Sequence, residues 1–139
     1  MSPTRPPSLL LCFYYGFLLL TTALGYGYPY PLWGTVLTGG WAKAAVVADC
    51  LVLLHIALGC WRAQRLSWFL LLGYNAFELL SLGVSLAVLG PAELEPFVQG
   101  VSMEAFYWTA GLSAALMIAM TALAVRRRES FVNRDIYLF

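Results

Sequence analysis

Four long apolar stretches alternate with shorter, more polar segments along the chain. The apolar stretches cover about residues 8–25, 44–61, 67–90 and 105–125. An α-helix needs roughly 20 mostly apolar residues to cross the hydrocarbon core of a bilayer, so each stretch is close to the required length. The pattern predicts an all-α fold, an integral membrane bundle of four transmembrane helices in which residues 1–139 form a single domain.

Composition restricts the class of protein further. Of the 139 residues, 61% are hydrophobic and 11% are charged. Soluble domains average about 45–50% apolar and about 25% charged residues. A soluble enzyme, a nucleic-acid-binding protein and a disordered chain are therefore not expected, and the lipid bilayer is the expected surrounding.

The first apolar stretch has a second interpretation, a cleaved signal peptide. Arg5 precedes it, and Ala23 and Gly25 form a small-x-small pattern near its end. The stretch is long, however, and contains Tyr14 and Tyr15, which favours a retained helix. Cleavage would leave three spans in the same orientation.

Basic residues are distributed unevenly between the two sides of a four-span arrangement. One side carries Arg5, Arg62, Arg65, Arg126, Arg127, Arg128 and Arg134, and the other carries only Lys43. Cytoplasmic segments of membrane proteins hold the excess of Lys and Arg. Both termini are therefore predicted to be cytoplasmic, with the arginines at 62, 65 and 126–128 as a basic anchor.

The segments outside the apolar stretches have simple interpretations with alternatives. Residues 26–41, rich in aromatic residues, Pro and Gly, predict a connector at the membrane interface or, alternatively, a ligand lid. Residues 91–104 lack Lys and Arg, and Pro91 is placed to start a short helix. We expect this segment to be a solvated connector or, alternatively, a site of cation attraction or partner docking. The basic and aromatic tail, residues 126–139, is expected to lie on the membrane or to dock a partner.

Motifs for catalysis or cofactor binding are not found. The cysteines, Cys12, Cys50 and Cys60, lie within apolar stretches and form no CxxC pair. His55 is the only histidine, so it has no partner for haem ligation. The chain has no phosphate loop and no nucleophile motif. We expect a non-enzymatic protein without a cofactor or a metal.

Polar residues within the apolar stretches are the candidate functional residues. The second stretch contains Asp49 and His55. The third carries a stripe within about 120° of helical arc, made of Tyr74, Asn75, Glu78, Ser81 and Ser85. Lipid cannot satisfy such groups, so the stripe is expected to be buried against other helices or a partner.

Asp49 and Glu78 are predicted to lie at similar depth. The second and third stretches are joined by a very short turn near residues 63 and 64, so residues whose numbers add up to about 127 pair across it. If the two carboxyls face each other, they share a proton or bind a cation, because both cannot ionise comfortably. His55 lies about 120° round the helix from Asp49 and need not share its face.

The fourth stretch carries a ridge of small residues. Gly111, Ala115, Ala119 and Ala122 lie on nearly one face, which lets another helix approach closely. Packing in the core of the bundle is the expected use of this ridge, and an external partner is the alternative.

These features leave two functional hypotheses. The first is a non-enzymatic accessory or small subunit that associates with other membrane helices in a homo- or hetero-oligomer. The second is a small proton- or cation-coupled transporter or channel-like protein that uses Asp49 and Glu78. The general plan resembles small bacterial four-helix inner-membrane proteins, which implies the bacterial cytoplasmic membrane as the location.

Overall fold

The computed structural model describes residues 9–98 and 100–134, and Arg5 and the end of the tail lie outside these ranges. The helices are α1 (Leu9–Leu24), α2 (Gly39–Trp61), α3 (Arg65–Val88), α4 (Pro91–Val98) and α5 (Met103–Arg126), with a 3-10 turn η1 (Arg128–Ser130). Two short strands, β1 (Tyr30–Leu32) and β2 (Thr35–Leu37), lie between α1 and α2. The predicted helical class is confirmed.

Helices occupy all four of the predicted apolar stretches. Within the described residues, α2, α3 and α5 are long and apolar enough to cross a membrane, whereas α1 is apolar but has 16 residues. The second helix begins at Gly39 rather than near residue 44, so Lys43 lies within α2 instead of in the preceding loop. The expected short helix at Pro91 is also present, as α4.

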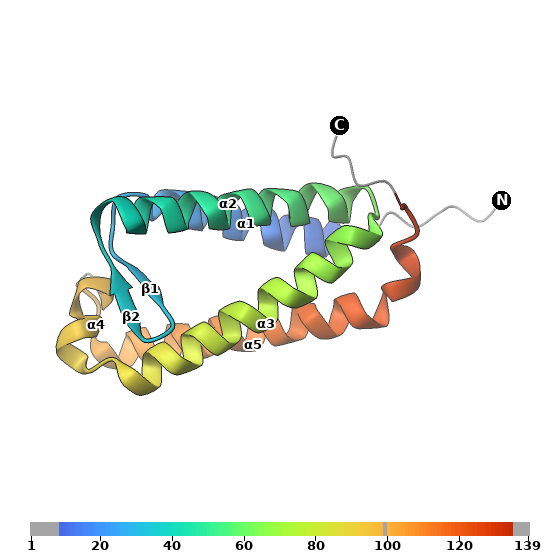
Figure 1. The fold of residues 1–139 in the computed structure, drawn as a ribbon. Helices are drawn as coiled ribbons and strands as arrows, with labels where there is room; N and C mark the ends of the chain where they lie inside the picture. Colours follow the sequence, from blue (N-terminus) through green and yellow to red (C-terminus); the bar gives the residue numbers. More distant parts are fainter. Residues whose placement is uncertain (1–8, 99, 135–139) are drawn as a thin grey trace.

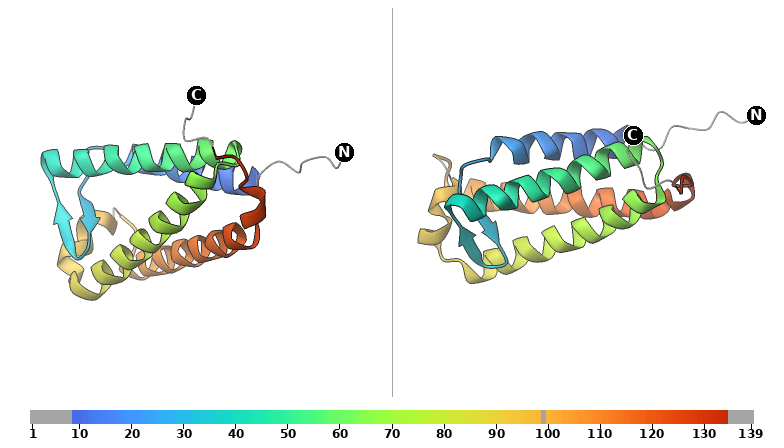
Figure 2. Two further views of the ribbon diagram at one scale, coloured as in Figure 1. Left: turned by 45° about the vertical axis from the view of Figure 1, so that its right-hand side comes forward. Right: turned by 45° about the horizontal axis from the view of Figure 1, so that its top comes forward.

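The long helices form two pairs that converge at one end and diverge at the other. In every view, α1 runs beside α2 and α3 runs beside α5 (Figures 1 and 2). The pairs meet where α2 turns into α3, which we call the turn end. At the opposite end, which we call the hairpin end, β1 and β2 extend from the α1–α2 pair toward α3 (Figure 1).

The turn end brings α2 and α3 into close contact. A side chain at Gly59 would overlap the Ser67 hydroxyl, so the absence of a Cβ there lets the two helices approach. Ala63 adopts a left-handed conformation with φ of 55° to reverse the chain. The backbone of Asn133 then pairs with that of Ala63 and Arg65, at 3.0 and 2.8 Å, and holds the C-terminal segment against this turn.

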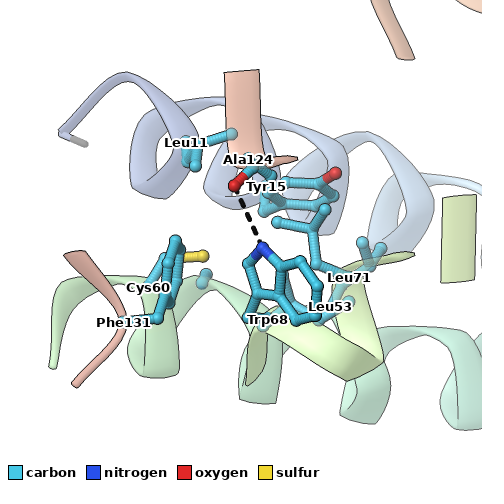
Figure 3. Packing of buried hydrophobic residues seen from close by; sticks show 10 residues of the cluster. Leu11, Tyr15, Leu53, Cys60, Trp68, Leu71, Ala124 and Phe131 are labelled. Carbon is cyan, nitrogen blue, oxygen red and sulfur yellow. Dashed lines mark hydrogen bonds between the residues drawn. The ribbon is translucent and has the colours of Figure 1, made fainter. Parts of the chain in front are cut away.

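The hydrophobic core lies at the turn end and draws on all four long helices. Its buried members are Leu11, Tyr15, Leu53, Ile56, Ala57, Cys60, Trp68, Leu71, Ala124 and Phe131 (Figure 3). The indole N–H of Trp68 donates to the carbonyl oxygen of Ala124 at 3.0 Å, which joins α3 to α5. This core orients the helices from which the hairpin end is built.

The hairpin end is bridged by a regular element where the sequence predicts an interfacial connector or, alternatively, a ligand lid. Strands β1 and β2 are antiparallel, with Tyr30 opposite Leu37. Their two-residue turn has positive φ at both positions, 49° at Trp33 and 78° at Gly34, as the tight turns of hairpins require. A Cβ on Gly34 would come within 3.1 Å of the Val88 side chain, so this glycine also permits close approach to α3.

Candidate functional site

A cavity of about 550 Å³ lies between α2 and α3, beneath strand β1. Its polar lining consists of Tyr30 from β1, Asp49 from α2, and Tyr74 and Glu78 from α3, and its other lining residues are apolar or glycine. Ala45, Ala48 and Gly73 keep the space open, because none of these small residues fills it. The divergence of the helix pairs thus leaves a largely apolar cavity that contains two carboxyl groups.

Asp49 is held by two phenolic hydroxyls. The hydroxyl of Tyr30 donates to Asp49 Oδ2 at 3.3 Å, and Tyr74 forms a second hydrogen bond with the same carboxyl group. Glu78 is near enough to interact electrostatically with Asp49. The structure therefore brings Asp49, Tyr74 and Glu78 together in one cavity, and it adds Tyr30 from a loop that the sequence did not connect with the site.

The ionisable carboxyl groups in the cavity have no basic residue beside them within the described ranges. Among the residues that the structure describes, no Lys, Arg or His lines this space. Burial raises the pKa of the Tyr30 hydroxyl, and the neighbouring Glu78 and Asp49 raise it further, so Tyr30 remains a protonated donor. Two carboxyl groups that lack a basic neighbour in a low-dielectric site cannot both ionise at low cost, so at least one of them holds a proton or the pair attracts a cation.

Asn75 lies on the predicted stripe but serves another purpose. It is fully buried, accepts a hydrogen bond from the Tyr15 hydroxyl at 2.9 Å, and donates to Thr121 Oγ1 at 2.7 Å. Thr121 in turn donates to the carbonyl oxygen of Met117. Asn75 thus connects α1, α3 and α5 through side-chain hydrogen bonds, the role that polar residues commonly have between membrane helices.

Ser81 and Ser85 bind the hairpin rather than another helix. Their hydroxyl oxygens accept hydrogen bonds from the backbone N–H groups of Trp33 and Gly34, each at 3.1 Å. The Trp33 ring packs edge-on against Phe77, with 5.6 Å between ring centroids. The expected burial of this part of the stripe is observed, but its partner is a tight turn whose donors need acceptors.

His55 does not belong to the cavity. It is half-buried on α2, and its Nε2 atom is buried without a hydrogen-bond partner in the described part of the chain. Over the same residues, 9–98 and 100–134, no group of three or more His, Cys, Asp or Glu is placed to hold a metal ion. His55 and Asp49 therefore share no site, in line with their angular separation.

The small-residue ridge of α5 faces outward. Gly111, Ala115, Ala119 and Ala122 are all exposed, and a Cβ added to Gly111 would meet no atom within 4 Å. The expected packing in the core is not observed, because hydrogen bonds from Asn75 and Trp68 turn the opposite face of α5 toward α3. The ridge is therefore uncovered in the single chain.

The predicted basic anchor is gathered at the turn end. All five of its members are exposed: Arg62, Arg65, Arg126, Arg127 and Arg128. The guanidinium group of Arg128 lies over the Trp68 ring, 5.4 Å from its centroid. Lys43 lies near the hairpin end, 5.7 Å from the centroid of the Tyr26 ring. The described positive charge is thus concentrated at one end of the helices.

The fold defines a helical protein in which, among residues 9–98 and 100–134, three helices are able to cross a membrane by length and composition. Comparisons with protein-family models, with curated proteins and with solved structures find no match in any of the three. The cavity between α2 and α3, with its two carboxyl groups, is therefore the basis on which a function can be proposed.

Proposed function

We propose that the protein crosses the membrane four times, with both termini in the cytoplasm and the hairpin end outside. The concentration of arginines at the turn end supports this orientation. Leu11 and Tyr15 of α1 are fully buried in the core, which supports retention of the first span. The resemblance in general plan favours the bacterial cytoplasmic membrane. Labelling of single cysteines introduced at Arg62 and Glu95 tests the orientation, and external labelling at Arg62 would contradict it.

Within that membrane, the cavity is best suited to a non-enzymatic role in proton or cation transfer. The observation that carries this proposal is the placement of Asp49 and Glu78 in one apolar cavity that lacks a basic lining residue. Ionisable groups at membrane depth are costly and commonly mark ion or proton pathways. Purely structural hydrogen bonding does not require two adjacent carboxyl groups, because Asn75 performs that task on the same helix.

The hairpin controls one side of this site. Tyr30 lies over the cavity and donates its hydrogen bond to Asp49. Exchange of a proton or cation with the hairpin side therefore requires Tyr30 to move away from the carboxyl group. The turn of the hairpin is held to α3 by hydrogen bonds to the hydroxyls of Ser81 and Ser85 and by the contact of Trp33 with Phe77, so these are the contacts that must break for the hairpin to open the site.

A second candidate function is that of an accessory or small subunit. The uncovered ridge of α5 favours it, since α5 is less buried than α2 and α3, the other two helices able to cross a membrane. Replacing Ala115 with Leu is expected to weaken helix association without lowering the stability of the monomer, because Ala115 is exposed. Leu112→Phe, on the same exposed helix, is the control. Equal self-association and partner recovery for both variants and the parent protein would contradict this role.

Proton flux into liposomes tests the first function directly. The parent protein is expected to conduct protons or exchange them for potassium, and Glu78→Gln is expected to abolish that flux, because an amide cannot ionise. Glu95→Gln changes an exposed carboxyl group on α4 and serves as the matched control. A parent protein without flux at both acidic and neutral pH would overturn the transport function, as would unchanged flux in Glu78→Gln.

A further inference from the structure

The cavity is much larger than a proton or a metal ion requires. Its volume of about 550 Å³ falls within the range of roughly 300–1,000 Å³ that is typical of small-molecule pockets. The two carboxyl groups lie near the middle of α2 and α3, and the space continues from them toward the turn end. There the lining is apolar, contributed by Val52, Leu66, Phe69 and Leu70. A ligand that fills this space must therefore have a substantial apolar part.

The polar groups favour an organic cation over a hard metal ion. Calcium takes six to eight oxygen ligands, and magnesium keeps several waters in an octahedral shell. Here the hydroxyls of Tyr30 and Tyr74 already form hydrogen bonds with Asp49, and the remaining lining offers no further oxygen side chain except Glu78. An alkylammonium group needs no complete oxygen shell. It is attracted by carboxylate charge and by the faces of aromatic rings such as Tyr74 and Phe77.

The cavity is also open at its side. Leu66, Phe69 and Phe77 line it and are nevertheless 39%, 53% and 43% exposed. In a membrane this opening between α2 and α3 faces hydrocarbon rather than water. A ligand dissolved in the bilayer can therefore enter laterally, with its charged head directed toward the carboxyl groups and its tail along the apolar walls.

We infer that the cavity binds an amphiphilic organic monocation, an ammonium group with an alkyl or aryl tail, whose head lies at Asp49 and Glu78. The inference rests on the proposed role of these two carboxyl groups and names the class of cation that they hold. With one of the two carboxyl groups protonated, the pair carries a single negative charge, which matches a single ammonium group. Neutral lipid chains fit the apolar walls but leave this charge without a partner.

Binding of radiolabelled decyltrimethylammonium to the full chain in zwitterionic nanodiscs tests the inference. Saturable binding is expected, with affinity on the order of tenfold weaker or worse in the double variant Asp49→Asn/Glu78→Gln, because the double change removes the negative charge of the pair, whereas a single change leaves one carboxylate. Glu95→Gln is the control for charge and should bind like the parent protein. Decanol and tetramethylammonium, which carry only the tail and only the head, should both compete poorly.

A cavity-filling variant separates this inference from the proposed transport function. Ala48→Phe occupies the space while keeping both carboxyl groups, so it should lose decyltrimethylammonium binding. Ala44→Phe, an exposed position outside the lining, is its control. If decanol competes as well as unlabelled decyltrimethylammonium does, the cavity is an apolar groove for lipid and the inference is overturned. Equally strong competition by tetramethylammonium would also overturn it.

The two proposals can fail separately. If the parent protein conducts protons but binds no decyltrimethylammonium, the inference of an organic cation is wrong and the transport function stands. If it binds decyltrimethylammonium with the expected dependence on the two carboxyl groups but shows no flux, the inference holds and the site is one of binding without transport. Loss of both signals overturns both proposals.

Discussion

The two ends of the helix bundle differ in how the space between helices is filled. At the turn end, Gly59 and Ser67 allow α2 and α3 to touch, and the core around Trp68 fills the remaining volume. Away from the turn the same helices diverge, and a cavity lies between them, covered at the hairpin end by the two-stranded element. The turn end is therefore filled by the core, whereas part of the space between α2 and α3 stays empty.

The difference arises from which side chains face the interface. Near the turn end the facing residues are large and apolar, such as Leu53 and Leu71, or small enough to allow direct backbone approach. Toward the middle of α2 and α3 they are Ala48, Gly73 and the two carboxyl groups, which neither fill the space nor pack tightly on one another. Stability and binding capacity are thus separated along a single pair of helices.

Adding a side chain at Gly59 should destabilise the turn end more than any other change there. Gly59→Val introduces atoms where the Ser67 hydroxyl lies, so the helices must separate. Overpacking of this kind costs about 1–3 kcal/mol, and we expect a loss near the upper limit because Ser67 is also buried. Thermal unfolding in detergent measures it. Gly83→Val, at a helical glycine with no neighbouring atom within 4 Å, should be far milder. Equal losses would show that the close approach is not a source of stability.

Removing the hydrogen bonds of Asn75 should have the next largest effect. Asn75→Leu leaves the buried Tyr15 hydroxyl without its acceptor, at a cost of about 1–3 kcal/mol in the free energy of unfolding. Tyr15→Phe in the same chain removes the unpaired hydroxyl and should restore part of the loss. Chemical unfolding of the single and double variants measures the coupling, and strictly additive losses would contradict a direct interaction.

Loosening the hairpin should lower stability at the hairpin end and leave the turn end unchanged. Ser81→Ala and Ser85→Ala remove the acceptors of the Trp33 and Gly34 N–H groups. Each change should cost about 0.5–1.5 kcal/mol locally, because one hydrogen bond is lost. Hydrogen exchange should become faster at those two amides and remain unchanged in the core. Ser113→Ala on α5 is the control. Faster exchange throughout the bundle would mean that the two ends are not independent.

Much of the fold follows from local pattern. The helices lie where apolar stretches are long, and Asp49 and Glu78 meet in one cavity because the connection between their helices is short. Pro91 begins α4 because its fixed φ and missing N–H suit the first turn of a helix. These features depend on the chain near each residue, so the sequence alone is informative about them.

The remaining features depend on distant partners. The rotation of α5 is set by hydrogen bonds to Asn75 and Trp68, so the sequence could not tell which of its two usable faces is buried. The position of the hairpin is set by Ser81 and Ser85, about 50 residues further along the chain. A Trp-Gly pair between two short apolar segments is the signal that could have indicated a tight turn at residues 33 and 34.

The most direct test of the account is an infrared titration of the carboxyl groups in the full-length protein in lipid. The titratable side chains that line the cavity are Tyr30, Asp49, Tyr74 and Glu78. We expect a protonated-carboxyl band that changes with pH, is lost in Glu78→Gln, and is retained in Glu95→Gln. A band that does not change with pH, or one that is identical in the parent protein and Glu78→Gln, would show that the pair exchanges no proton and would contradict the account.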